Sequence, residues 1–361
     1  MSVRINRIRA MPPPVQTYTY LHASELRASA AGRTLALATS GGATPAGPVA
    51  NPGFFSGFLT TPAVAASALL RIAEVAATRY HQPNSAASRD PVITASGDRL
   101  RLESFSGCCG VYARLDILES GLDGDEVGYG TTNVDVSPPL RRALLGLGGV
   151  DPLYLRVGPE AVEVTTFDGR FVERKVPLPQ RWLRGFAEAQ VLAAGFTLRA
   201  EVPATEAAAL LRSIPRAIGR SGTGGTRWVV PEGRRLRPVL RPGRGAVCLP
   251  GAHRLSTLQP VLRYAQAVRI YAPAEPAVPS PAADGATAVA WEAILPGMRL
   301  TLVLSPSAAR GFSGEGGVLT DLATGAAAGD ADLVCALLAW EPRIDVVELS
   351  RMSGLPAGRV R

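Results

Sequence analysis

The pattern of apolar positions predicts a helix soon after residue 60. Thr61 is a favourable N-cap residue, and Pro62 suits the first helical position because the N–H that proline lacks has no helical partner there. Apolar residues then recur at every third or fourth position: Ala65, Leu69, Ile72, Ala76 and Tyr80. We therefore expect a helix over this stretch, followed by a polar loop at 81–90.

Weaker patterns precede this helix. Residues 22–31 are consistent with one short helix. Residues 40–52 are rich in glycine, proline and alanine, a composition typical of a linker. We interpret residues 1–50 as an N-terminal segment and linker.

Strand and helix patterns alternate from residue 92 to 305, and this range predicts a compact body. Ser137 and the two prolines after it start a helix that carries Leu140, Leu144 and Leu147 on one side. The strands expected after this helix are 153–157, 161–166 and 171–176. Asp168-Gly169 is a strong signal for the hairpin between the last two. The pattern therefore predicts a helix followed by an antiparallel meander.

A similar run follows in the second half. We expect helices at 203–214 and 255–267, and strands at 268–271, 288–294 and 299–304. Segments 136–145 and 202–211 resemble each other 66 positions apart. A duplicated α+β unit, as in sliding-clamp-like folds, accounts for this likeness, and so does chance similarity between two helices rich in leucine and alanine. The predicted fold class is α+β, with an antiparallel-sheet body and helices.

The C-terminal residues predict the start of a winged helix-turn-helix. A helix begins at Asp332, and Asp345 with Glu348 has the spacing of a capping box for a second helix at 346–352. Pro356 opens a third segment, so we expect the chain to stop inside the recognition helix of a longer natural protein. The domains expected are 1–50, a body at 51–330 with halves 51–200 and 201–330, and 331–361.

Composition indicates a folded chain with a basic surface. Hydrophobic residues make up 47% of the sequence, which excludes wholesale disorder, and 38 basic against 30 acidic residues give a net charge of +8. No apolar run approaches the length of a membrane span, so no membrane partner is expected. Cys108, Cys109, Cys248 and Cys335 fit neither a disulfide framework nor a zinc knuckle. We expect a reduced, cytoplasmic protein.

No catalytic or metal-binding constellation emerges from the sequence. The histidines His22, His81 and His253 are mutually remote. The acidic residues near a Gly-rich loop lack the remaining ligands of a cation site: Asp98, Glu103, Asp116, Asp123, Asp125 and Glu126. Burial in a strand or tight turn is favoured for Cys108-Cys109 over reactivity. We predict a protein that is not an enzyme, with no cofactor and no metal.

Nine arginines between residues 212 and 244 form the clearest electrostatic feature, since Glu232 is the one acid among them. A flexible loop of this kind suits an anionic partner, because guanidinium groups grip phosphates and an indole can stack on a base. The candidate nucleic-acid-binding residues are Arg220, Arg227, Trp228, Arg234, Arg235, Arg237 and Arg241, with Arg359 and Arg361 at the C-terminus. The alternative is a solvated loop in a protein that uses arginine and has Lys175 as its one lysine.

Several strings resemble those of actinobacterial SWIM zinc-finger family proteins. They lie at 51–58 (NPGFFSGF), 98–112 (DRLRLESFSGCCGVY), 130–133 (GTTN), 173–186 (ERKVPLPQRWLRGF) and 311–316 (GFSGEG). The resemblance covers about residues 50–361. It implies a domain that precedes a winged helix and a CxC…CxH finger, in proteins encoded beside MoxR-type AAA ATPases and von Willebrand A proteins. This chain has no CxC, so the zinc ligands cannot be carried over.

Two classes of function follow. The first is a non-catalytic adaptor or regulator of a MoxR-type ATPase and von Willebrand A (VWA) system, associated with DNA. The second is an enzyme with an unfamiliar site around residues 98–133, where the polar strings concentrate. The basic run and the helix-turn-helix start favour the first.

Overall fold

The computed structural model describes side chains over most of the body and near the C-terminus. The described residues are 53–78, 91–176, 178–214, 227–239, 243–274, 287–306, Phe312 and 346–353, with the side chains of 177–181, 183 and 184 left aside. Nearer the N-terminus the backbone of five short strands is described: β1 (Thr19–Tyr20), β2 (Glu25–Ser29), β3 (Gly32–Ala36), β4 (Ser40–Thr44) and β5 (Gly47–Val49). These strands pair in two small sheets, β1-β4-β5 and β15-β3-β2, where β15 is Leu178–Pro179.

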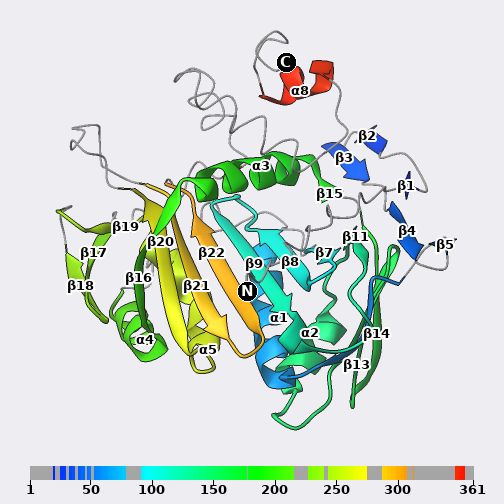
Figure 1. The fold of residues 1–361 in the computed structure, drawn as a ribbon, viewed down its shortest axis with the longest axis horizontal. Coiled ribbons are helices and arrows are strands. Elements are labelled where there is room, and N and C mark those ends of the chain that lie inside the picture. Colours follow the sequence, from blue (N-terminus) through cyan, green and yellow to red (C-terminus); the bar gives the residue numbers. More distant parts are fainter. Residues whose placement is uncertain are drawn as a thin grey trace, which may run out of the picture.

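An eight-stranded sheet in the order β11-β7-β8-β9-β22-β21-β20-β16 runs through the centre of the molecule, and every pair in it is antiparallel (Figure 1). Its strands are β7 (Val92–Ser96), β8 (Arg99–Phe105), β9 (Val111–Leu118), β11 (Tyr129–Asn133), β16 (Phe196–Pro203), β20 (Ala267–Pro273), β21 (Val289–Leu295) and β22 (Met298–Leu304). The α+β class with antiparallel sheet is therefore confirmed.

Two further antiparallel sheets flank the central one. The first has the order β10-β6-β12-β13-β14, with β6 (Phe55–Leu59), β10 (Leu122–Gly124), β12 (Tyr154–Val157), β13 (Ala161–Thr166) and β14 (Gly169–Arg174). The second has the order β18-β17-β19, with β17 (Arg227–Glu232), β18 (Arg235–Val239) and β19 (Val247–Leu249). In Figure 1 the second sheet lies at the left margin of the molecule and β14 at the right.

The first helix begins where the sequence indicates. It is α1 (Pro62–Ala77), with proline in the first turn. The Thr61 hydroxyl donates across to the Pro296 carbonyl (3.4 Å) instead of capping the helix. Ala65, Ile72 and Ala76 are buried as their spacing predicts, whereas Tyr80 and the loop at 81–90 lie outside the described residues.

The later helices are shorter. Ser137 caps α2 (Pro138–Gly146), because its hydroxyl accepts a hydrogen bond from the Leu140 amide (3.3 Å). The others are α3 (Gln180–Ala194), α4 (Ala204–Ser213), the 3₁₀ turns η1 (Glu119–Gly121) and η2 (Ala252–Leu258), α5 (Gln259–Leu262) and α8 (Val346–Ser353).

The element order repeats four times along the chain. Each unit is a strand, a helix and two or three strands: β6-α1-β7-β8-β9, β11-α2-β12-β13-β14, β16-α4-β17-β18 and β19-η2-α5-β20-β21-β22. Within each half of the body, the first strand of each unit pairs with a strand of the other unit. In the first half β6 lies beside β12 and β11 beside β7, and in the second half β16 lies beside β20 and β19 beside β17. The similar segments 136–145 and 202–211 occupy equivalent places at the start of α2 and α4.

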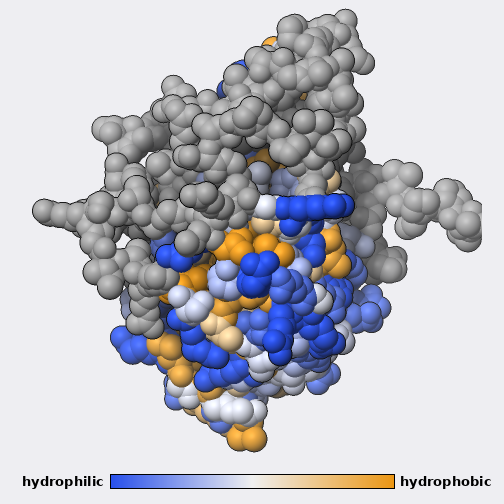
Figure 2. All heavy atoms as spheres, turned by 90° about the vertical axis from the view of Figure 1, so that its left-hand side faces the viewer, coloured by the Kyte–Doolittle hydropathy of each residue, from blue (hydrophilic) through white to orange (hydrophobic). Residues whose placement is uncertain are grey.

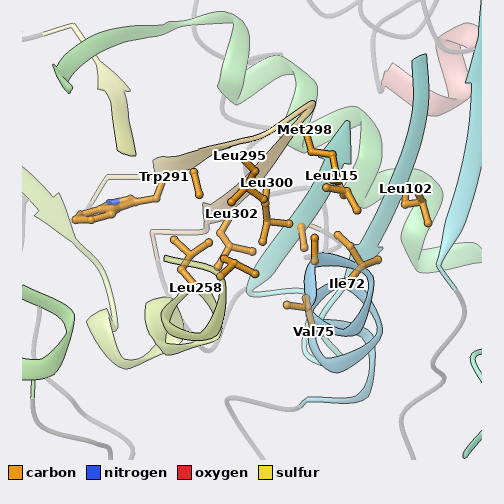
Figure 3. Packing of buried hydrophobic residues seen from close by; sticks show 14 of the residues in the cluster. Ile72, Val75, Leu102, Leu115, Leu258, Trp291, Leu295, Met298, Leu300 and Leu302 are labelled. Atoms are coloured by element: carbon orange, nitrogen blue, oxygen red, sulfur yellow. The ribbon is translucent and has the colours of Figure 1, made fainter. Parts of the chain in front are cut away.

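The main core lies between the central sheet and the helices on one of its faces. Alternate residues of β8, β9, β21 and β22 point toward α1 and η2, as Figure 3 shows for Leu115, Leu300 and Leu302 opposite Ile72 and Leu258. All five side chains are fully buried. Period-two alternation in the strands and the apolar stripe of α1 thus meet in one layer.

Helix α3 covers part of the other face of the sheet (Figure 1). An aromatic cluster forms there from Phe105, Tyr112, Trp182, Phe186 and Phe312. Most ring centroids within it are about 5–6 Å apart, with edge-on or tilted planes, the geometry that aromatic quadrupoles favour. This cluster fixes α3 on the sheet.

Three expectations about secondary structure are wrong. Residues 25–29 form strand β2, not a helix, because they pair antiparallel with residues 32–36. The expected linker contains β4 and β5. The helix expected over 255–267 is a short helical segment that ends at Leu262, since Ala267 begins β20.

The expected helix-turn-helix is described only in part. Its second helix appears as α8, close to the predicted 346–352. The segments around residues 332–340 and 356–361, and Asp345, lie outside the described residues.

Candidate functional site

The arginine-rich stretch forms a β-hairpin where the structure describes it. Strands β17 and β18 are joined by Gly233 and Arg234, and Gly233 has a positive φ of 60° that glycine adopts without steric cost. Val229 and Leu236 are buried and hold one face of the hairpin against the core. The expectation of a flexible loop is wrong for residues 227–239, because β17 and β18 pair over five positions and bury Trp228, Val229 and Leu236.

The hairpin presents its arginines to solvent. Arg234, Arg235 and Arg237 are exposed, and Arg227 is half-buried. Arg237 forms an ion pair with Glu232, Nε to Oε1 2.6 Å. For Arg234 and Arg235 the described part of the chain offers no ion-pair partner.

The remaining arginines of this stretch fall into two groups. Arg212 at the end of α4 and Arg244 in the turn before β19 are exposed. Arg216, Arg220 and Arg241, and the C-terminal Arg359 and Arg361, lie outside the described residues.

Trp228 does not have the role that the sequence suggested. Its side chain is only 9% exposed, and its backbone pairs with Val239 on one side and Cys248 on the other. A ring in this position has little free surface for stacking on a base. The indole is a packing residue of the small sheet.

A residue not singled out from the sequence fixes the hairpin in place. Glu206 of α4 accepts a hydrogen bond from the Leu236 amide on the outer edge of β18, with its Oε1 2.9 Å from that nitrogen. No local pattern in the sequence links Glu206 to a strand thirty residues later. The contact anchors the arginines on a rigid element.

The surface on this side of the molecule is mainly hydrophilic. Figure 2 shows hydrophilic residues over much of the described surface, interrupted by several hydrophobic patches. The hairpin of β17 and β18, which carries the exposed arginines, lies at the left margin of the molecule near β16 and α4 (Figure 1). The arrangement suits contact with an extended anion rather than enclosure of a small one.

Asp116, within the acidic region at 98–126, forms a network with two arginines on the outer face of the central sheet. Asp116 is 2% exposed and lies between two arginines, with the Arg101 Nε at 2.7 Å from Oδ1 and the Arg114 Nε at 3.0 Å from Oδ2. These residues lie side by side on β8 and β9, in neighbouring register positions. The arrangement is a buried carboxylate paired with two half-buried arginines.

Glu103 and Tyr112 extend this network toward the aromatic cluster. The Tyr112 hydroxyl donates to Glu103 Oε1. Burial raises the pKa of Glu103 above its ordinary value, against the opposing effect of Arg101. Burial, with the nearby Glu103 carboxyl, holds the pKa of Tyr112 well above 10. Both groups are sealed among neighbours, and neither faces open solvent.

The other polar residues expected near this region are also engaged or dispersed. Asn133 donates to the Val176 carbonyl, and Asp98 pairs with Arg99 at the surface. Asp123, Asp125 and Glu126 are exposed. In the portion of the chain with described side chains, no three histidine, cysteine, aspartate or glutamate residues form a group that could hold a metal ion.

The vicinal cysteines lie in the tight turn between β8 and β9, as the sequence indicates. Cys109 is buried and has a positive φ of 51°, and its amide donates to the Ser106 carbonyl (2.7 Å). The turn is held by Arg254, a fully buried residue that sequence reasoning missed. The Arg254 guanidinium donates to the carbonyls of Gly110, Pro250 and Ser305. It therefore links the two halves of the body.

Comparison with known proteins gives weak likenesses of fold alone. No protein-family profile and no curated protein matches the chain. Among solved structures, the chain is similar to a PCNA2–PCNA3 complex from Sulfolobus tokodaii, with a TM-score of 0.47 and 11% identity over 70% of this chain and 99% of that one. It is also similar to Proliferating Cellular Nuclear Antigen from Entamoeba histolytica, with a TM-score of 0.43 and 10% identity over the same shares. Likenesses at this level say nothing about function.

Within the described ranges, no helix combines the length and the apolar character that a membrane crossing requires.

Proposed function

We propose that this protein is a non-catalytic adaptor that binds a polyanion, and that nucleic acid is the ligand. The observation that carries the proposal is the pair Arg234 and Arg235 at the tip of the β17–β18 hairpin. Both are exposed, and neither has an ion-pair partner among the described residues. Guanidinium groups in this state are available to phosphate oxygens.

The hairpin favours binding through its rigidity. Glu206 and the buried Leu236 hold β18 in place, so the backbone that carries the arginines is already ordered before a ligand arrives. Less conformational entropy is then lost on association than for a disordered basic loop. Arg237 contributes less than its neighbours because Glu232 already neutralises it.

The binding should be indifferent to sequence. Phosphate contacts position a protein on nucleic acid and carry no base information. The one aromatic residue of the hairpin, Trp228, is buried and has little surface for a base. The expected ligand class is therefore duplex or single-stranded nucleic acid without a preferred sequence.

The wider setting of the proposal rests on the sequence. The likeness to SWIM zinc-finger family proteins supports a regulatory role beside a MoxR-type ATPase and a VWA protein. Helix α8 is consistent with a winged helix-turn-helix at the C-terminus, and the four repeated units with exchanged first strands support a clamp-like body. The non-catalytic part of the proposal is supported by the partners that Asp116, Glu103 and Asn133 have within the fold.

A binding measurement with a matched control tests the proposal. Arg234→Ala/Arg235→Ala should weaken binding to a fluorescent DNA duplex at low salt. Arg142→Ala/Arg156→Ala is the control, because it removes the same charge from two exposed positions on α2 and β12. Equal loss in both variants would show that binding follows net charge alone, and unchanged affinity in the hairpin variant would refute the proposal.

A further inference from the structure

The free edges of the sheets differ in how they are protected. A strand edge presents unpaired N–H and C=O groups, and proteins usually blunt such edges. Strand β18 contains Pro238, which has no N–H, and its Leu236 amide is bound to Glu206. Strand β16 is interrupted by a bulge at Arg199. These two edges are poor templates for another strand.

In the five- and eight-stranded sheets, the edges at the other end are also short or covered where the structure describes them, with one exception. Strand β10 has three residues. Strand β11 continues into a bridge between Val134 and Lys175 and has β4 beside it. Strand β14 has six residues, no proline and no bulge, and over Gly169–Glu173 its outer side has no strand partner among the described residues. Just beyond, the bridge between Lys175 and Val134 and the bond from the Val176 amide to the Asn133 carbonyl cover the edge. The stretch 169–173 is the exception.

The register of β14 shows which backbone groups face outward. The Gly158 amide donates to the Ala161 carbonyl, so residues 161, 163 and 165 direct their backbone groups toward β12. Residues 162, 164 and 166 therefore bond to β14, opposite 173, 171 and 169. The N–H and C=O groups of Arg170 and Val172 therefore face the free edge, whereas the outward side of Arg174 lies next to the bridge between Val134 and Lys175.

The side chains at these positions give the edge a chemical character. Arg170 and Arg174 are exposed and flank Val172, which is 48% exposed. The Arg170 side chain remains 63% exposed although it pairs with Glu163 (2.6 Å). Phe167, in the turn that leads into β14, is 78% exposed. The edge thus offers a positive, an apolar and a positive position in alternation.

We propose that β14 is a docking edge for an extended acidic segment of a partner protein, which adds to the five-stranded sheet as a further strand. Main-chain hydrogen bonds to residues 170 and 172 would hold the segment, and alternate side chains would give specificity. Acidic residues in the partner would lie beside Arg170 and Arg174, with an apolar residue beside Val172. A segment with an acidic, an apolar and an acidic residue at alternate positions fits this edge.

Charge argues against a second copy of this chain as the occupant. If two β14 strands paired antiparallel about Val172, each Arg170 would face an Arg174 of the other chain. Like charges directly opposite each other on a sheet are unfavourable. The same arginines that reject self-pairing select an acidic partner. The inference does not depend on nucleic-acid binding by the hairpin, which lies at the opposite margin of the molecule (Figure 1).

The test uses the full chain and a labelled synthetic peptide in which glutamate, valine and glutamate alternate with threonine. Val172→Pro removes one outward N–H at an exposed edge position, which a folded sheet tolerates. We expect this change to weaken peptide binding about tenfold, because it removes one main-chain hydrogen bond and disturbs the alignment of the adjacent ones. Val172→Thr keeps the N–H and should weaken binding much less. Circular dichroism of each variant verifies the fold.

Charge variants separate this edge from general electrostatics. Arg170→Glu/Arg174→Glu should abolish binding of the acidic peptide and allow binding of a peptide with lysine in place of glutamate. Arg234→Glu/Arg235→Glu, which changes the charge equally at the hairpin, should leave acidic-peptide binding nearly unchanged. Equal binding by the wild type and Val172→Pro would overturn the proposal, as would equal effects of the two charge reversals. A concentration-dependent dimer of the wild type that Val172→Pro abolishes would also overturn it, in favour of a second copy.

Discussion

Replacement of Arg254 by methionine tests how the two halves of the body are held together. Arg254 is fully buried, and its guanidinium donates to the Pro250 carbonyl (2.5 Å), the Gly110 carbonyl (2.5 Å) and the Ser305 carbonyl (2.8 Å). Methionine fills a similar volume but donates no hydrogen bond. The change therefore removes donors while leaving the packing nearly intact.

The expected cost follows from the carbonyls that are left behind. The Gly110 carbonyl keeps the Ser305 amide as a donor at 3.1 Å. The carbonyls of Pro250 and Ser305 lose their Arg254 donors, and an unsatisfied buried carbonyl costs about 1–3 kcal/mol. The variant no longer has to bury a positive charge, and this gain offsets part of the loss in unfolding free energy. We expect the free energy of unfolding to fall by about 3 kcal/mol.

Urea unfolding, followed by circular dichroism and by tryptophan fluorescence, measures this loss. Arg263→Met is the matched control, because Arg263 is exposed and lies over the Tyr264 ring, where its loss should cost less than about 1 kcal/mol. The loss of unfolding free energy in Arg254→Lys should lie between the losses in Arg254→Met and Arg263→Met, since one ammonium group cannot reach all three carbonyls together. If Arg254→Met unfolds at the same urea concentration as the wild type, the account of Arg254 as the link between the halves is refuted.

Three further predictions concern single side chains. Gly297→Ala should lower stability by about 2 kcal/mol in thermal unfolding, because Gly297 has a φ of 66° and a Cβ there would lie 2.6 Å from the Gly121 Cα; an unchanged melting temperature would contradict this. Burial raises the pKa of Glu103. The contribution of this group to the stability of the folded protein is therefore present below its ordinary pKa of 4.5 and is lost as the pH rises through its pKa in the folded protein. Glu103→Gln should therefore flatten the fall in unfolding free energy between acidic and neutral pH, and an identical pH profile would count against the burial effect. Glu232→Gln frees Arg237 and should tighten DNA binding at low salt by about two- to fivefold in a fluorescence titration, whereas weaker binding would show that the ion pair orders the site.

Local patterns in the sequence predicted much of the body. Ser137 before two prolines located α2, and Asp168-Gly169 located the hairpin of β13 and β14. Each of these signals acts within a few residues, through a cap or a turn geometry. The likeness of segments 136–145 and 202–211 pointed to duplication for the same reason, because both start equivalent helices.

Features that depend on distant partners could not be read in this way. The exchange of β6 and β11 between sheets is set by tertiary packing, which no local period records. The stretch 227–239 looked like a loop because arginines and prolines surround its buried residues Trp228, Val229 and Leu236, so no regular period is visible in the sequence. Residues 25–29 have a weak pattern, and pairing with 32–36 decides their state.

The candidate site was predicted in composition but not in geometry. The arginine run was visible, and its excess of charge suggested an anionic partner. That Arg234 and Arg235 remain exposed while Arg237 pairs with Glu232 depends on the hairpin register. Trp228 was misjudged because an indole near arginines looks the same in sequence whether it is buried or exposed.

The salt dependence of DNA binding tests the central claim most directly. The affinity of the wild type and of Arg234→Ala/Arg235→Ala for one duplex is measured from about 50 to 200 mM salt, and log Kobs is plotted against log salt. Each lost phosphate contact should reduce the slope by about 0.9, so the double variant should be shallower by roughly 2, and adding Arg237→Ala should change it little further. The same slope for the wild type and the double variant would contradict the assignment of this hairpin as the site that binds nucleic acid.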